Sequence, residues 1–238
     1  MKISIFNFAF LTFLVVNFSF AQGGANYLDI KGTIGNSIGG SNTDVNNATG
    51  FWAPVKMEDK TITGTNYLFK NFEGLYVVTN KSGNSFKLLN LNYNLSSGTL
   101  ETRISKDSVF QYDLKVIDYV TAGNKKYKNL NEGELSGLVL EVFKGKNFNI
   151  YKKIDIGLLE GTINPMTQEK IQQDKYQQSY TYYTSTNGII DKIKFNKSAI
   201  LKLTKDKQAQ VKEYAKSNNL DFNNEIDVNI ILKYFESL

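Results

Sequence analysis

Residues 148–159 read FNIYKKIDIGLL, and this stretch decides the fold class of the chain. Apolar side chains recur along one side of it, namely Phe148, Ile150, Ile154, Ile156 and Leu158. On the other side stand Asn149, Tyr151, Lys153 and Asp155. Successive side chains of a strand point to opposite faces, so this alternation predicts a strand with one buried and one solvated face.

Shorter runs of the same kind fill the chain from Phe51 to about Ile163, and turn residues separate them. Such a pattern is typical of an antiparallel meander. A change of phase at Leu88–Leu89 predicts a bulge, and the polar stretch 164–178 predicts an exposed loop or a short helix. The other strands that we expect lie at 75–79, 85–95, 99–104, 109–112, 114–121, 138–143, 180–184 and 189–195.

The last residues, 196–238, carry three helical patterns, each beginning at a residue that can cap a helix. Asn196 precedes the first, Thr204 the second, and Asn223 or Asn224 the third. The faces expected from helical spacing are Ile200, Leu201 and Leu203, then Val211, Tyr214 and Ala215, then Ile226, Ile230 and Tyr234.

Together these patterns predict an α+β protein. We expect an antiparallel β-meander domain at 51–195, arranged as a sandwich or a partly open barrel. The short helices of the tail, 196–238, are expected to pack on this β domain.

The first 21 residues have the features of a cleavable signal peptide. Lys2 precedes an apolar run, and Ser19 and Ala21 are the small residues required three and one positions before the cut. A retained membrane anchor is the alternative, but polar residues interrupt the run. Gln22, not cysteine, follows the cut, so we expect no lipoprotein. We expect a periplasmic or secreted protein without a transmembrane segment after cleavage, beginning with a flexible Gly- and Asn-rich segment at 22–50.

The composition removes several classes of chemistry. The chain has no histidine and no cysteine, which excludes Ser-His-Asp and Cys-His triads, thiolate nucleophiles and histidine-ligated zinc. It also has no phosphate-cradling glycine loop and no dinucleotide fingerprint, and we expect neither a cofactor nor a metal. The 28 basic residues, against 23 acidic ones, are lysines apart from Arg103. The arginine contacts of nucleic-acid readers are therefore missing, and we expect no nucleic-acid partner.

Two kinds of site remain open. A pair of carboxylates would suffice for a hydrolase, although acids on the solvated face of a sheet are usually only hydrated. The acids in or near predicted strands are Glu132, Glu134, Glu141, Asp155 and Glu160. Exposed aromatic rings would instead bind a glycan or a lipid, although packing at sheet edges is their ordinary role. The candidate binding residues of this second kind are Trp52, Tyr180 and Tyr182.

Three motifs carry a resemblance to known sequences. They are Gly64-Thr65-Asn66-Tyr67-Leu68, Leu91-Asn92-Tyr93-Asn94-Leu95, and the tail from Asn196-Lys197-Ser198 to Tyr234-Phe235-Glu236-Ser237-Leu238. Through these motifs, residues 64–238 resemble a family of uncharacterised exported proteins of Bacteroidetes with a β-rich body and a lysine-rich helical tail. The resemblance implies export and this fold, and it attaches no chemistry to them.

These observations favour a non-enzymatic envelope or periplasmic protein that acts by contact with another protein or an envelope component. A glycan- or lipid-binding β module is the first alternative, and an acid-pair hydrolase is the second. The partners that we expect are an envelope protein or a glycan. The sequence leaves the oligomeric state open.

Overall fold

The computed structural model describes residues 50–54, 62–106 and 108–238 of the chain. The predicted signal peptide, 1–21, and residues 22–49 of the predicted N-terminal segment lie outside the described residues. Within the described ranges, none of the helices combines the length and the apolarity needed to cross a membrane.

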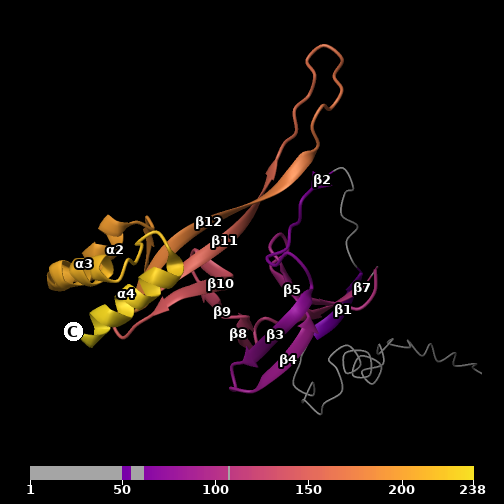
Figure 1. Cartoon of the computed structure of the whole chain (residues 1–238). Coiled ribbons are helices and arrows are strands. Elements are labelled where there is room, and N and C mark those ends of the chain that lie inside the picture. Colours follow the sequence, from indigo (N-terminus) through magenta and orange to yellow (C-terminus); the bar gives the residue numbers. More distant parts are fainter. Residues whose placement is uncertain (1–49, 55–61, 107) are drawn as a thin grey trace, which may run out of the picture.

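Most strands form one large sheet that runs through the molecule (Figure 1). Its order is β13-β12-β11-β10-β9-β8-β3-β4, with β2 beside β12. From β8 onward each strand pairs antiparallel with the next along the chain, whereas β2 runs parallel to β12. The bounds are β2 Ile62–Thr63, β3 Glu73–Asn80, β4 Ser85–Asn90, β8 Ile117–Ala122, β9 Lys125–Glu132, β10 Leu135–Lys144, β11 Asn149–Leu159, β12 Asp174–Thr186 and β13 Ile189–Ile193.

A second, four-stranded sheet is largely inserted between β4 and β8 and has the order β1-β7-β6-β5. Its bounds are β1 Gly50–Pro54, β5 Asn92–Asn94, β6 Thr99–Arg103 and β7 Ser108–Tyr112. The chain enters it at the fully buried Leu91. The buried Asn92 amide stabilises this crossing, because it accepts from the Phe69 N–H and donates to the Phe69 carbonyl, both at 2.9 Å. The prediction of one strand over 85–95 is therefore wrong, because β4 ends at Asn90 and the chain changes sheets at Leu91. The β3–β4 pairing is irregular between Leu88 and Asn90, next to the predicted bulge, but the additional residue lies on β3, between Glu73 and Tyr76.

The main hydrophobic core joins both sheets and the C-terminal helices. Val78 and Leu88 contribute from the large sheet and Leu100 from the small one, and all three are at most 1% exposed. A smaller cluster lies apart from this core and consists of Leu135, Val139, Tyr151 and Tyr183. Tyr151 is thus buried, although the alternation in β11 placed it on the solvated face. The middle of the large sheet therefore carries buried side chains on both faces.

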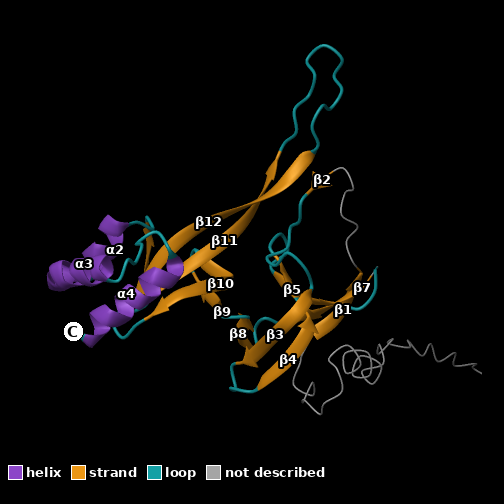
Figure 2. Cartoon of the chain, in the orientation of Figure 1, coloured by secondary structure: helices purple, strands orange, loops and turns teal. Residues whose placement is uncertain are grey.

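Three helices, purple in Figure 2, lie over the end of the large sheet that contains β10 to β13. They are α2 Lys197–Leu203, α3 Gln208–Ser217 and α4 Glu225–Ser237, with a 3₁₀ turn at Lys205–Lys207 between α2 and α3. The Asn229 side chain of α4 donates to the Val142 carbonyl of β10 at 2.6 Å.

Two predicted helix caps are confirmed. The side chains of Asn196 and Asn224 accept backbone N–H groups of their own first turns at 3.0 and 2.9 Å. The cap predicted at Thr204 is wrong, because this hydroxyl donates to the Leu201 carbonyl and α3 begins only at Gln208.

The face predicted for the last helix is also wrong. Ile226 and Ile230 are 63% and 40% exposed, whereas the fully buried residues of α4 are Val228, Ile231 and Leu232. Both sets have helical spacing, so the periodicity alone could not choose between them.

The predicted α+β class is confirmed by the two sheets and the C-terminal helices. Neither described sheet closes into a barrel, and the arrangement is a sandwich of open sheets. Strand β9 was not predicted, because Tyr127 is its one buried residue and its other positions are mostly lysine and asparagine. The loop or helix predicted at 164–178 is wrong from Asp174 onward, where β12 begins.

Candidate functional site: a hairpin arm

The clearest feature outside the core is a two-stranded arm that projects from the large sheet (Figures 1 and 2). We define the arm as residues 153–181, which comprise the outer parts of β11 and β12 and the turn between them. The partner strands end at its base, because β10 pairs with β11 only as far as Lys152, and β13 with β12 only as far as Tyr182. At about 3.3 Å per residue, the two-stranded part projects roughly 20 Å before the turn begins.

The two faces of the arm differ in chemistry. One face carries three cross-strand pairs, Ile154 with Tyr180, Ile156 with Gln178, and Leu158 with Tyr176. The opposite face carries Lys153 with Thr181, Asp155 with Ser179, Gly157 with Gln177, and Leu159 with Lys175. The arm is therefore an amphipathic ribbon, whose apolar face continues the face that is buried nearer the core.

A short segment braces one edge of the arm against the body. Strand β2 pairs with Asp174 and Lys175, and the Gln178 side chain donates to the Tyr67 carbonyl at 2.8 Å. Gly64 adopts a φ of +87°, and a side chain there would lie 3.0 Å from the Tyr176 carbonyl oxygen. The brace covers part of the β12 edge. Among the described residues no strand pairs with the β11 edge over 153–159.

The turn at the end of the arm is held by hydrogen bonds of its own. Asp174 accepts the Gly161 N–H at 2.7 Å and pairs with Lys170 at 2.7 Å. The Asn164 side chain accepts the Met166 N–H at 2.9 Å, and Ile163 forms a bridge with Lys170. The hydrogen bond from Gly161, followed by the one from Lys170, lowers the pKa of Asp174.

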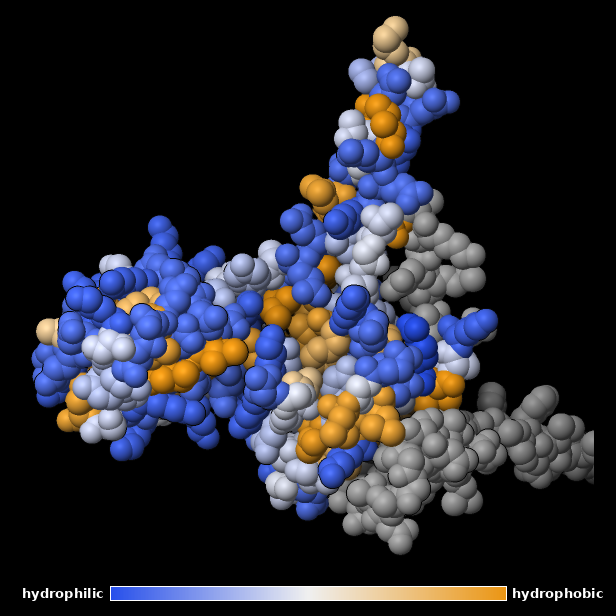
Figure 3. All heavy atoms as spheres, viewed as in Figure 1, coloured by the Kyte–Doolittle hydropathy of each residue, from blue (hydrophilic) through white to orange (hydrophobic). Residues whose placement is uncertain are grey.

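Large apolar side chains are exposed along the arm and its tip (Figure 3). They are Leu158 at 50%, Leu159 at 56%, Ile163 at 52%, Met166 at 92%, Ile171 at 64% and Tyr180 at 62%. The arm also carries three lysines and four acids, a net charge of −1. They lie on both faces of the ribbon, with Leu158 and Tyr180 on one face and Leu159 on the other, and on the turn. Exposed apolar surface concentrated on one near-neutral element is a feature of interaction sites.

A polar cluster at the base ties the arm to α4. The same carboxylate oxygen of Glu225 accepts from Lys152 at 2.8 Å and from the Tyr182 hydroxyl at 2.6 Å. Burial raises the pKa of Glu225, but the hydrogen bonds from Lys152 and Tyr182 outweigh it, so this pKa lies below its ordinary value. Burial and the bond to Glu225 raise the pKa of the Tyr182 hydroxyl. The Tyr182 ring stacks on Phe195 at 4.2 Å.

The structure brings two of the three predicted binding residues together. Tyr180 and Tyr182 share the apolar face, with ring centroids 5.9 Å apart. Trp52 belongs to β1 in the other sheet, where it pairs with Phe110. Tyr182 already bonds to Glu225 and stacks on Phe195. The Lys152 ammonium lies 4.3 Å from the centre of the Tyr180 ring. One face of the exposed Tyr180 ring is therefore already occupied.

Sequence reasoning missed the tip. Met166 and Ile171 lie in the polar stretch 164–178, and Ile163 directly precedes it. The three residues show no strand alternation. The signal that could have extended β12 was the spacing of Tyr176, Gln178 and Tyr180, which places the two tyrosines on one face of a strand.

The acids proposed for a hydrolase are spread over the molecule. Glu141 faces Lys126 at 3.6 Å, and Asp155 faces Lys153 at 3.3 Å. Glu132 and Glu134 do line one cavity of about 480 Å³ at the β9–β10 turn. Both are exposed, and Glu134 accepts the Tyr183 hydroxyl at 3.0 Å. Glu132 and Glu134 are therefore solvent-exposed, as most acidic residues on protein surfaces are. Within the described residues no group of three acids is placed to hold a metal ion.

No protein-family model, no curated protein and no solved structure matches this chain. The functional proposal therefore rests on the structure of the arm.

Proposed function

We propose that this protein is a non-enzymatic, exported contact protein that binds another protein through the arm. The observation that carries the proposal is the set of exposed apolar side chains on a braced, hydrogen-bonded ribbon, with Met166 at 92%. Removing such surface from water stabilises a complex by about 25 cal/mol per Å². A fixed turn also loses less conformational entropy on binding than a flexible loop.

The edge of the arm favours a protein over a lipid bilayer. Over 153–159 the outward backbone groups of β11 have no strand partner among the described residues. An extended segment of a protein can add to such an edge by main-chain hydrogen bonds. Hydrocarbon offers no hydrogen bonds to it. The net charge of −1 provides no attraction to anionic headgroups either. We therefore propose a partner with an apolar groove for the tip and an extended segment for the β11 edge.

Glycan binding receives less support from the same residues. A sugar needs a free aromatic face, and the Tyr180 ring has Lys152 over one side. Tyr182 is stacked on Phe195. The chemistry excluded by the missing histidine and cysteine supports the non-enzymatic part of the proposal.

Site-specific photocrosslinking in the native host tests the proposal. A photoreactive amino acid at Met166 should give one discrete protein adduct. The same probe at Leu75, a 58% exposed apolar position on β3, should give none. The adduct should be lost when Ile163 and Ile171 are both replaced by serine. A control with Ile226 and Ile230 replaced by serine should retain it.

Two results would contradict the arm as the binding element. One is an adduct of equal yield from Leu75 and Met166, and the other is no protein adduct from Met166. A lipid adduct at Met166, with flotation of the purified chain on neutral phosphatidylcholine vesicles, would replace the protein partner by a membrane.

A further inference from the structure

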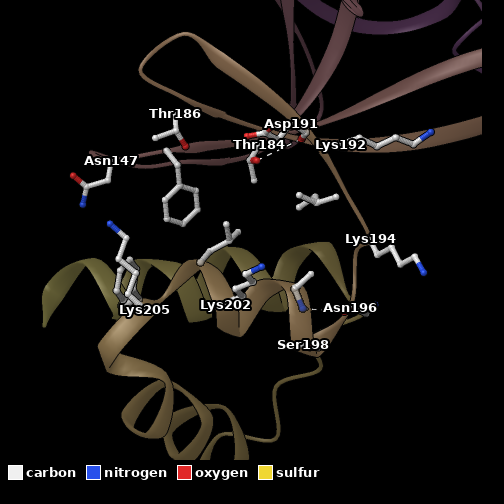
Figure 4. Close-up of a pocket in the computed structure, with 15 residues that line it drawn as sticks. Asn147, Thr184, Thr186, Asp191, Lys192, Lys194, Asn196, Ser198, Lys202 and Lys205 are labelled. Atoms are coloured by element: carbon white, nitrogen blue, oxygen red, sulfur yellow. Dashed lines mark hydrogen bonds between the residues drawn. The ribbon is translucent and has the colours of Figure 1, made fainter.

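A cavity of about 670 Å³ lies between the free edge of the large sheet and the helical tail (Figure 4). Thr184, Thr186 and Asp191 line it from β12 and β13, Asn147 lines it from the turn after β10, and residues of α2 line it from below. Cavities of 300 to 1,000 Å³ are the usual size of small-molecule sites. This cavity is at the opposite end of β12 from the tip of the arm.

The residues that line the cavity carry more positive than negative charge. Lys192, Lys194, Lys202 and Lys205 line it, and Asp191 is its one acid. None of the four lysines has an ion-pair partner among the described residues. Figure 4 shows Lys202 and Lys205 reaching toward the cavity, while Lys192 and Lys194 extend away from it. Two exposed lysines without an ion-pair partner in the described part of the chain therefore face the space where a ligand would lie, with Asp191 as the one acid of the lining.

Lys205 has an unusual backbone. Its φ of +48° lies in the left-handed region, which disfavours residues with a Cβ atom and favours glycine. Lys205 directly follows Thr204, the C-cap of α2, and helices commonly end with a left-handed residue at this position. This turn places Lys205 at the end of the cavity that Asn147 and Thr186 also line.

The remaining wall is apolar. Phe148, Ile193, Leu203 and Phe235 line it, and the two phenylalanine rings pack with centroids 6.4 Å apart. A small hydrophilic anion would use the lysines and leave this wall in contact with water. A neutral apolar molecule would use the wall and leave the lysines uncompensated.

We infer that the cavity binds an acyl chain with an anionic head group, the head held by Lys202 and Lys205 and the chain lying against the apolar wall. A carboxylate and a phosphate both accept the charge-assisted hydrogen bonds that ammonium groups donate. Fatty acids and phosphate-bearing single-chain lipids are the two sources of this chemistry. This site is separate from the protein contact proposed for the arm.

Calorimetric titration of the full chain with four probes tests the inference. The probes are myristate, a lysophosphatidic acid with the same chain, myristyl alcohol and inorganic phosphate. At least one of the two anionic amphiphiles should bind, and the tighter of them identifies the head group. The alcohol and inorganic phosphate should each bind at least about tenfold more weakly. The alcohol lacks the anionic head group, and phosphate lacks the apolar chain.

Two lysine variants separate the site from the general charge of the tail. Lys202→Gln with Lys205→Gln should weaken binding about tenfold or more. Lys212→Gln with Lys216→Gln changes the same charge on exposed positions of α3 outside the cavity and should leave binding unchanged. Lys205→Gly should weaken binding and yet raise the melting temperature, because glycine relieves the positive φ.

The inference is overturned if neither anionic amphiphile binds, if the alcohol or phosphate binds as tightly as they do, or if the Lys202/Lys205 variant binds like the wild type. The arm-tip variant Ile163→Ser with Ile171→Ser should bind the amphiphile normally. A loss of crosslinking with retained amphiphile binding would therefore separate the two proposals.

Discussion

The inner and outer halves of the β11–β12 ribbon have the same alternating pattern and different surroundings. In the inner half, Ile150 is fully buried, and Tyr182 is bonded to Glu225 of α4. In the outer half, Leu158 has the same phase along the strand and is 50% exposed. The helices cover one half and end before the other. Alternation in the sequence therefore predicts which side chains share a face of the strand. It does not predict whether another element covers that face.

This difference also divides stability from recognition. Burial in the inner half contributes to the folding free energy, whereas exposed apolar surface in the outer half stabilises the protein only when a partner covers it. If the comparison is right, substitutions along one ribbon should fall into two classes.

The largest effect is expected from truncating the inner half. Ile150→Ala should lower the free energy of unfolding by about 3 kcal/mol, because it leaves a cavity in the core. Leu158→Ala, on the same face, should cost less than about 1 kcal/mol. Urea denaturation followed by circular dichroism, with equal m values, measures both. Equal losses in the two variants would remove the distinction between the halves.

A smaller effect is expected at the junction between the halves. Glu225→Ala leaves the Lys152 ammonium and the Tyr182 hydroxyl without their shared acceptor and should cost about 2 kcal/mol. Asp155→Ala removes the ion pair with Lys153 on the more exposed part of the ribbon and should cost less than about 0.5 kcal/mol. Comparable costs at the two positions would mean that the base cluster does not tie the arm to α4.

The pH dependence of the Glu225 variant has a defined sign. The pKa of Glu225 is lower in the folded protein than its ordinary value of 4.5. Its contribution is therefore complete above about pH 4.5 and is lost as the pH falls through the folded-state pKa. The stability gap between wild type and Glu225→Ala should be full at pH 6 and smaller at pH 3. A gap that widens in acid would contradict this arrangement.

The smallest effect on global stability is expected at the tip. Asp174→Asn weakens the bond from the Gly161 N–H and removes the ion pair with Lys170. Hydrogen exchange of the Gly161 and Ile171 amides should become faster, while the melting temperature stays within error. Glu169→Gln, whose side chain forms no hydrogen bond or ion pair within the described part of the chain, should leave exchange unchanged. Unchanged exchange in Asp174→Asn would show that the tip is held by other contacts.

Much of the fold could be predicted because it follows from local chemistry. The alternation over 148–159 identified β11, and Asn196 and Asn224 marked the starts of two helices. Strand β9 was not predicted, because Tyr127 is its one buried residue and the strand therefore lacks an alternating apolar pattern. The change of sheet at Leu91 was not predicted either. In the sequence, a buried residue between two strands gives the same pattern of apolar residues as a bulge within one strand.

The candidate sites were less accessible to sequence reasoning. Tyr180 and Tyr182 were identified as binding candidates, and the structure places both on one face near the base of the arm. The tip was not identified, since Met166 and Ile171 stand alone among polar residues. The lysines at 192, 194, 202 and 205 look like a solvated face until the fold gathers them around one cavity with Phe148 and Phe235.

By itself the sequence determined the α+β class and the caps of two helices, and it excluded chemistry that needs histidine or cysteine. The first two follow from the period of the side chains and from hydrogen bonds between residues close in the sequence. The third follows from composition alone, which does not depend on the order of the residues. Only the tertiary structure decided which apolar faces are covered, how far β11 and β12 extend beyond their neighbours, and which lysines line one cavity. Those properties depend on contacts between distant segments, such as Glu225 with Lys152 and Gln178 with Tyr67, which no local pattern records.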